Sequence, residues 1–132
     1  MMTPNDAPDA PDRGERYIAL IHPFWGSVKG DVIKIVQDYN RRTPTRRRIL
    51  VEDIGRRLSL RGDGVGLDVT LEVERERLRS RFTQHPPRGQ KPTIREFRVD
   101  VRPDYLVLLD SQGCPVEHPD QLLLTPLFRA LG

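Results

Sequence analysis

A strict alternation of apolar and polar residues over positions 67–74 is the clearest pattern in the chain. Its apolar members are Leu67, Val69, Leu71 and Val73, and its polar members are Asp68, Thr70, Glu72 and Glu74. Because successive side chains of a strand point to opposite faces, the pattern predicts a half-buried strand of an antiparallel sheet. A shorter alternation over Phe97, Val99 and Val101 predicts a second strand of this kind.

A helix is predicted over residues 27–40. Apolar residues recur there at helical spacing and form one face, which consists of Val28, Val32, Ile35, Val36 and Tyr39. Ser27 is a suitable N-cap for this helix. Thr43-Pro44 ends any continuation, because proline has no N–H to donate.

Two short and continuously apolar runs are interpreted as strands. The first covers residues 17–21 and is expected to end at His22-Pro23, because the residue before a proline avoids the helical conformation. Phe24-Trp25-Gly26 is then expected to form a turn. The second run covers residues 105–109 and predicts a strand in the middle of the sheet.

The segment 46–60 fits two structures. The strands would cover 47–52 and 56–60, whereas a helix would carry Leu50, Ile54 and Leu58 on one face. Strands are favoured for two reasons. Gly55 would weaken a helix by about 1 kcal/mol, and Ile49, Leu50 and Val51 follow one another in the first half of the segment, which is typical of a strand.

The rest of the chain is assigned from turn residues and shorter patterns. We predict a turn at 62–66, a short helix at 74–82, a proline-containing loop at 83–92, a turn at 110–113 and a closing helix at 119–131 that is interrupted or restarted at Pro126.

Together these elements predict an α+β fold, with one mostly antiparallel or mixed sheet and helices packed on one face. The length of 132 residues suits a single domain, which we place at 16–132. Residues 1–15 interleave proline with aspartate and are predicted to be a disordered tail. The expected core contains Val28, Val32, Ile35 and Val36 from the helix, the apolar side of strand 67–74, and Val99, Val101, Leu106 and Leu108 from the later strands.

Composition bears on where the protein acts. No apolar run approaches the ~20 residues of a membrane-spanning helix, and the first 16 residues lack the apolar core of a secretory signal. Cys114 is the only cysteine, so the chain cannot form an internal disulfide. These features predict a cytoplasmic location and no membrane partner.

The positive charge of the chain is concentrated in one segment. Residues 41–61 contain eight arginines and two acidic residues, a local net charge of +6, whereas the whole chain carries only +3. Arginine binds phosphate and carboxylate groups in a bidentate manner, so this segment is the strongest functional indication. The basic residues are 19 Arg and 3 Lys, and such a bias can also be compositional.

Several catalytic and metal-binding patterns are incomplete. The glycines at 62, 64 and 66 precede an alternating strand instead of the helix N-terminus that a phosphate loop requires. The histidines His22, His85 and His118 are far apart, and Cys114 with His118 supplies only half of a zinc site. Cys114 as a nucleophile has no identifiable third group beside His118. We therefore predict no catalytic residues, no metal and no cofactor.

The candidate binding residues are Arg41, Arg42, Arg46, Arg47, Arg48 and Trp25. Our leading hypothesis is a non-enzymatic interaction or accessory module that binds a protein partner partly through segment 41–61, whose arginines would suit an acidic partner. One alternative is a nucleic-acid-binding domain that uses the same arginines, and a second is a small enzyme with a site near His22 and Trp25. Trp25 also has a purely structural interpretation, as the anchor of its turn in the core. The sequence does not predict an oligomeric state.

Overall fold

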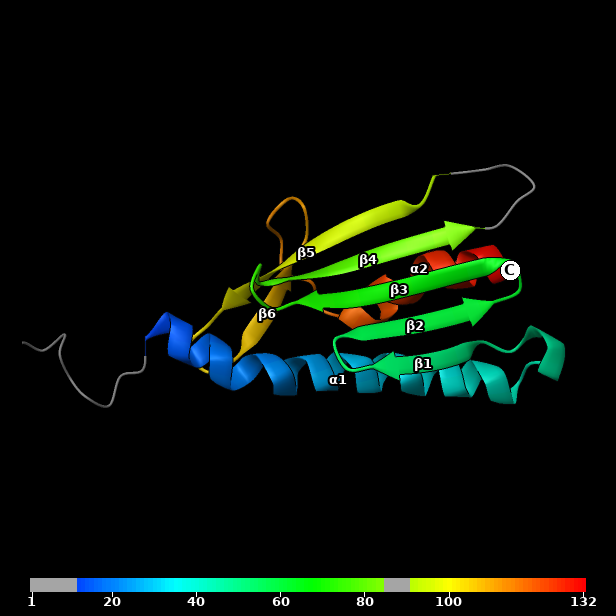
Figure 1. The fold of residues 1–132 in the computed structure, drawn as a ribbon, viewed down its shortest axis with the longest axis horizontal. Helices are drawn as coiled ribbons and strands as arrows, with labels where there is room; N and C mark the ends of the chain where they lie inside the picture. Colours follow the sequence, from blue (N-terminus) through cyan, green and yellow to red (C-terminus); the bar gives the residue numbers. More distant parts are fainter. Residues whose placement is uncertain (1–11, 85–90) are drawn as a thin grey trace, which may run out of the picture.

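In the part of the chain that the structure describes, residues 12–84 and 91–132, six strands run up and down in the order β1-β2-β3-β4-β5-β6 (Figure 1). Each strand pairs antiparallel with its neighbour in sequence. In this computed structural model the elements are α1 (Arg13–Arg41), a 3-10 turn η2 (Thr45–Arg47), β1 (Leu50–Ile54), β2 (Arg57–Gly62), β3 (Val65–Glu72), β4 (Arg77–Gln84), β5 (Thr93–Val101), β6 (Leu106–Leu109) and α2 (Pro119–Leu131).

Both helices pack on one face of the sheet. Helix α2 contacts β3 and β4, and α1 contacts α2, β5 and β6. In Figure 1 the sheet lies in front of α2, and no described element covers the face toward the viewer. The predicted single α+β domain, with an antiparallel sheet and its helices on one face, is confirmed.

Helix α1 is about twice as long as the sequence pattern predicted. Its buried residues are Tyr17, Ile21, Trp25, Val28, Val32 and Val36, which follow one another at intervals of three or four residues. This spacing keeps all six on one side of a helix. The predicted strand at 17–21 and the predicted turn at 24–26 are therefore wrong, because both segments extend the stripe that was recognised only from Val28 onward.

Pro23 lies inside α1 and does not end it. Proline removes one backbone hydrogen bond from a helix, and here its side chain is exposed, away from the packed face. The helix begins after Asp12, whose carboxylate accepts a hydrogen bond of 2.7 Å from the backbone N–H of Glu15. Asp12 is thus the N-cap instead of Ser27. Residues 13–15 belong to the helix and not to the predicted tail, whose residues 1–11 lie outside the described chain.

Segment 46–60 forms two strands and not a helix, as the preferred interpretation predicted, but the first strand begins at Leu50 because residues 45–47 form the 3-10 turn η2. β1 and β2 are joined by a two-residue turn at Gly55-Arg56, and Gly55 has a φ of +66° that suits glycine. The predicted turn at 62–66 is also confirmed, because Asp63-Gly64 connects β2 to β3 and Gly64 has a φ of +70°. Both turns are short enough to fix the register of the strands that they join.

Two further element predictions are wrong. Residues 74–82 contain no helix, since β4 begins at Arg77 and pairs with β3 and β5. The i, i+4 spacing of Leu78 and Phe82 also fits a strand, in which the buried Ser80 lies between them on the same face.

Strand β6 lies at an edge of the sheet and not in its middle. Of the predicted loop 83–92, residues 85–90 lie outside the described chain, and Thr83 and Gln84 belong to β4.

The predicted core is confirmed. All twelve residues assigned to it from the sequence belong to one cluster between the sheet and the helices, with Ile35, Val73 and Val101 partly buried at its margin. Helix α2 adds Leu123, Leu124 and Leu127, each at most 1% exposed.

Arg95 of β5 helps to hold helix α2, because its guanidinium donates a 2.9 Å hydrogen bond to the carbonyl oxygen of Leu122. Burial lowers the pKa of this arginine. Among the described helices, none has the length and apolar character needed to cross a bilayer.

The buried Tyr17 gives the fold a dependence on alkaline pH. Its hydroxyl donates to the carbonyl oxygen of Val73 at 2.5 Å, and burial, together with the nearby Glu76 and Glu74, raises the pKa of Tyr17 above the ordinary value of 10.0. The folded state therefore favours the neutral phenol, so this stabilisation is complete below pH ~10 and is lost as the pH rises through the higher folded pKa.

We expect Tyr17→Phe to lower the free energy of unfolding by about 1 kcal/mol at pH 7, because one partly buried hydrogen bond is lost. The gap between wild type and variant should narrow above pH ~10, where the phenol of the unfolded wild type ionises. Urea unfolding of both proteins between pH ~7 and ~11 measures this. If the difference in unfolding free energy between the two proteins stays constant or widens as the pH rises, the raised pKa of Tyr17 in the folded state is contradicted.

Candidate functional site

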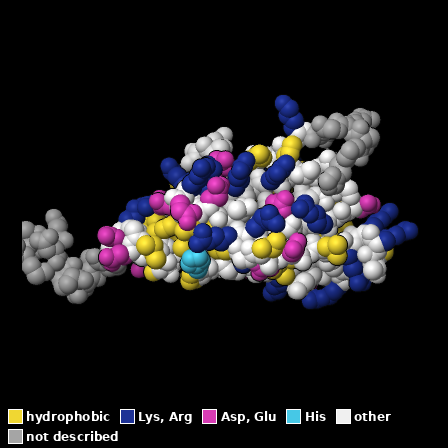
Figure 2. All heavy atoms as spheres, viewed as in Figure 1, with side chains coloured by type: hydrophobic (Ala, Val, Ile, Leu, Met, Phe, Trp, Pro, Cys, Tyr) yellow, Lys and Arg dark blue, Asp and Glu magenta, His cyan; other side chains and the backbone are white. Residues whose placement is uncertain are grey.

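The five candidate arginines lie at one end of the molecule, where α1 passes through η2 into β1 (Figure 2). All five side chains are exposed. Arg41 pairs with Asp38 at 3.1 Å, Arg42 donates to the Asp38 carbonyl at 3.3 Å, and Arg48 donates to the Thr43 carbonyl at 3.2 Å.

Arg46 and Arg47 differ from the other three. Their side chains make no hydrogen bond or ion pair with another described residue. They project from the 3-10 turn immediately before β1, which makes them the arginines best placed to meet a partner beside this strand.

Trp25 does not share this surface. Its side chain is only 3% exposed, and its indole Nε1–H donates to the carbonyl oxygen of Gly55 at 2.7 Å. The burial of Trp25 contradicts its assignment to the binding surface and agrees with the structural interpretation, in which it anchors the core. What it anchors is the β1-β2 turn, and not a turn in its own segment.

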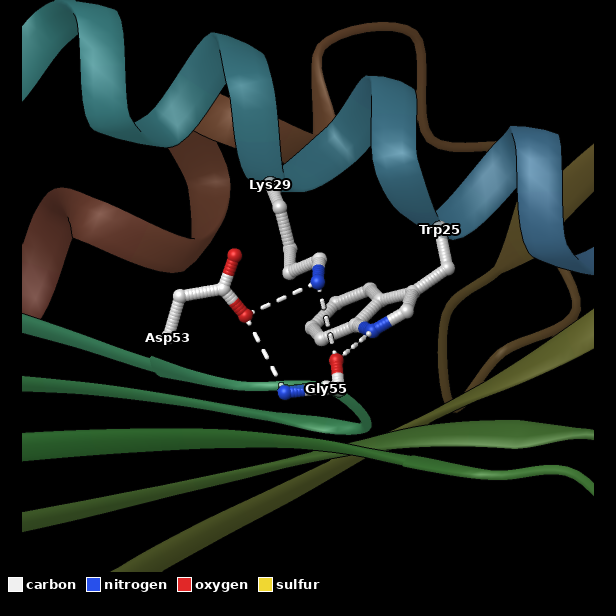
Figure 3. Close-up of polar contacts among 4 residues, drawn as sticks. All are labelled: Trp25, Lys29, Asp53 and Gly55. Carbon is white, nitrogen blue, oxygen red and sulfur yellow. Dashed lines mark hydrogen bonds and ion pairs between the residues drawn. The ribbon is translucent and has the colours of Figure 1, made fainter.

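Helix α1 holds both ends of β1. At the start, the Asn40 side chain accepts a 2.8 Å hydrogen bond from the Ile49 N–H and donates one of 2.9 Å to the Ile49 carbonyl. At the far end, the Lys29 ammonium donates to Asp53 and to the Gly55 carbonyl, each at 2.9 Å (Figure 3). Trp25 donates to the same carbonyl, so that two donors from α1 converge on one oxygen. The strand that follows the arginines is therefore fixed relative to the helix.

β1 is an edge strand, with β2 on one side and no described strand on the other. All five of its residues are exposed, and three are apolar: Leu50 at 71%, Ile54 at 46% and Val51 at 37%. The register places Leu50 opposite Arg61 and Ile54 opposite Arg57, so both apolar side chains belong to the face of the sheet that the helices leave uncovered. At the other edge, Leu109 of β6 forms a further bridge with Pro115.

Sequence reasoning placed the arginines but did not recognise the edge strand beside them. Edge position depends on the order of all strands in the sheet, and the sequence of β1 alone does not reveal it. The one available sequence signal was the pattern LVEDI, which places the acidic Glu52 between apolar Leu50 and Ile54 on one face of the strand.

The other candidate residues are dispersed. His22 is exposed on α1, His118 is the N-cap residue of α2, and His85 lies outside the described residues. Cys114 is exposed, and its backbone N–H donates to Asp110; it shares no hydrogen bond with His118. Within residues 12–84 and 91–132, no three His, Cys, Asp or Glu side chains gather in a way that could hold a metal ion.

Comparisons with protein-family models, curated proteins and solved structures give no match to this chain.

Proposed function

We propose that this protein is an interaction module that binds an extended, acidic segment of another protein by adding it as a strand beside β1. The observation that carries the proposal is that β1 is an exposed edge strand fixed at both ends by α1. No reaction is assigned to the site, and the free Cys114 fits a reducing cytoplasm.

Strand addition supplies affinity through the backbone. Every second residue of an edge strand directs its N–H and C=O groups away from the sheet, where an extended chain can pair with them. Proteins usually protect such edges with charges, prolines or bulges. β1 carries two such charges, Glu52 and the Asp53 that pairs with Lys29, but it also presents apolar Leu50, Val51 and Ile54. Because the hydrogen bonds to α1 already hold this strand in place, little conformational freedom is lost when a partner binds.

Charge determines which partner fits. Arg46 and Arg47 lie directly before β1 without a counter-ion among the described residues, so acidic side chains beside the paired segment would bind them. A second copy of this chain is a poor occupant. Antiparallel pairing of two β1 strands would place residues 46–48 of one copy beside Arg56 and Arg57 of the other, and these like charges repel each other.

A displayed library of short peptides, selected against the purified protein, tests the proposal. We expect the selected peptides to alternate apolar residues and to carry Asp or Glu at the end that meets η2. Leu50→Lys combined with Ile54→Lys should weaken their binding by about tenfold or more, since it removes apolar contacts and repels an adjoining strand. Fluorescence anisotropy with labelled peptides measures the affinities.

Ile18→Lys is the matched control, because Ile18 is an apolar residue of α1 with 72% exposure that lies away from β1. It should leave binding unchanged. The proposal fails if no peptide is enriched, or if the double variant binds the selected peptides as well as wild type does. Two further results would show that the partner is not an acidic peptide. If wild type is a dimer and the double lysine variant is a monomer, the partner is a second copy of this chain. If single-stranded nucleic acid binds with submicromolar affinity at ~200 mM salt, and binding depends on residues 46–48, the partner is nucleic acid.

A further inference from the structure

A second candidate site lies on the uncovered face of the sheet, across β2, β3, β4 and the start of β5. There a hollow of about 260 Å³ is lined by Arg57, Thr70, Arg79, Arg81 and Ile94, together with Asp68 and Pro92. The strand register explains this convergence. Arg57 and Arg79 lie on either side of Thr70, and Arg81 lies opposite Asp68 in the adjacent row of the same face.

The three arginines of this hollow form no ion pair among the described residues, unlike other arginines of the face. Arg79 lies opposite Glu96 and helps to lower the pKa of Glu72, but both carboxylates are paired with Arg77. Arg77 pairs with Glu72 at 2.7 Å and with Glu96 at 3.0 Å, and the hydrogen bond from Arg77 lowers the pKa of Glu72. By contrast, the guanidinium groups of Arg57, Arg79 and Arg81 make no hydrogen bond or ion pair with another described residue.

Asp68 does not neutralise the hollow. Its carboxylate already accepts a 2.7 Å hydrogen bond from the Ser59 hydroxyl and pairs with Arg61 at 3.6 Å. The hollow thus holds three guanidinium groups against one carboxylate that is engaged elsewhere. Arg57 on β2 and the two arginines on β4 face each other across β3, so their like charges repel, and an anion bound among them would relieve that repulsion.

We propose that this hollow binds the phosphoryl group of a small phosphate monoester. Guanidinium groups form paired hydrogen bonds with phosphate oxygens, and the Thr70 hydroxyl adds a further donor between Arg57 and Arg79. The apolar wall formed by Ile94, which is 45% exposed, suits the organic part of such an ester. The hollow is slightly smaller than the 300–1,000 Å³ typical of small-molecule sites, so the ligand must be compact.

A compact ligand fits this face better than a nucleic-acid backbone does. The row that holds Arg57, Thr70 and Arg79 continues to Glu96, and the row that holds Asp68 and Arg81 begins at Glu52. Figure 2 shows acidic side chains among the basic ones on this face. A polyanion that crosses the sheet would meet these carboxylates, whereas a single phosphoryl group would not. The inference is independent of the proposed protein partner, because the hollow lies on β2–β5 and not on β1.

Phenyl phosphate and inorganic phosphate are suitable probes, followed by the amide chemical shifts of the ¹⁵N-labelled protein. We expect saturable shifts at Thr70 and Ile94, with tighter binding of phenyl phosphate because its ring contacts Ile94. Arg79→Gln combined with Arg81→Gln should weaken binding at least tenfold. Arg79→Lys with Arg81→Lys should lose part of the affinity, because lysine keeps the charge but not the planar pair of donors.

Arg46→Gln combined with Arg47→Gln is the matched control, since it removes the same charge from two other arginines without a described counter-ion. It should bind phenyl phosphate as wild type does. The glutamine variant of the hollow should melt at the wild-type temperature or above it, which shows that lost binding is not lost folding. The proposal is overturned if no saturable shift occurs up to about 10 mM probe, if the control weakens binding equally, or if an oligonucleotide binds the hollow more tightly than phenyl phosphate.

Discussion

We expect Val32→Asp to abolish the fold. Val32 lies in the middle of α1, is 1% exposed, and belongs to the cluster between the helices and the sheet. A carboxylate there would be buried without a partner, which costs several kcal/mol beyond the lost apolar contacts. Since domains of this size are stable by about 5–15 kcal/mol, we expect the variant to lose its cooperative melting transition in circular dichroism.

Ile18→Asp is the control on the same helix. Ile18 is 72% exposed, so the new carboxylate stays in water and should change the free energy of unfolding by only about 0.5 kcal/mol. A normal melting curve for Val32→Asp would refute the assignment of this helix face to the core.

Neighbouring residues of β3 allow the same comparison within the sheet. Leu71 is 2% exposed beneath the helices, whereas Thr70 belongs to the opposite face, between Arg57 and Arg79. Leu71→Asp should unfold the protein, and Thr70→Asp should fold, because its carboxylate faces guanidinium groups that lack counter-ions. If both variants fold, or both unfold, the two sides of β3 have been assigned incorrectly.

These comparisons are possible because the sequence predicts faces better than it predicts element boundaries. The period of two in β3 and the helical period from Val28 onward state directly which side chains are buried, and the structure agrees. The alternation is visible in the sequence of the strand itself. The apolar face of β3 could therefore be assigned to the core without knowing which strands lie beside it.

The first half of α1 was not predicted because a short apolar run and a proline indicated a strand there, and they concealed the helical spacing of the longer segment. Residues 17–21 are continuously apolar, and Pro23 follows, which together resemble a strand and its end. The stripe becomes visible only when Tyr17, Ile21 and Trp25 are joined to Val28 across the proline. Pro23 is tolerated there because it lies on the exposed side of the helix.

The candidate sites were only partly predictable for a different reason. The five candidate arginines of segment 41–48 are exposed because they lie at the end of a helix and in its connection to a strand, a position that the local sequence indicates. The hollow depends on arginines of β2 and β4 that meet only through their register with β3. The edge position of β1 likewise depends on the order of the strands. Both are long-range properties, which no local pattern encodes.

Trp25→Ala is expected to have the largest effect among truncations that introduce no charge. Replacing a buried tryptophan with alanine usually costs about 3–5 kcal/mol, because apolar contacts are lost and a cavity remains. Here the indole also donates to Gly55 and lies beneath the Lys29 ammonium, 5.4 Å from the ring centroid. Urea unfolding followed by circular dichroism measures the loss, since Trp25 is the only tryptophan and its fluorescence disappears in the variant. A cost below about 1 kcal/mol, the scale of an ordinary surface change, would contradict the packing described.

The convergence of Trp25 and Lys29 on one carbonyl oxygen makes a sharper test within the same site. Trp25→Phe keeps an aromatic ring but removes the N–H, and Lys29→Met removes the ammonium; in either variant the Gly55 carbonyl retains one donor. Only the double variant leaves that oxygen without a donor from α1. Because Gly55 is exposed and its oxygen is only partly buried under Trp25, the cost is about 1 kcal/mol, the lower end for a lost hydrogen bond to an acceptor. The double variant should therefore lose more stability than the two single losses combined, by about 1 kcal/mol. It should also exchange the amide hydrogens of β1 faster than either single variant, because this carbonyl holds the β1-β2 turn against the helix (Figure 3). Additive losses with unchanged exchange in β1 would mean that the turn is held by packing alone.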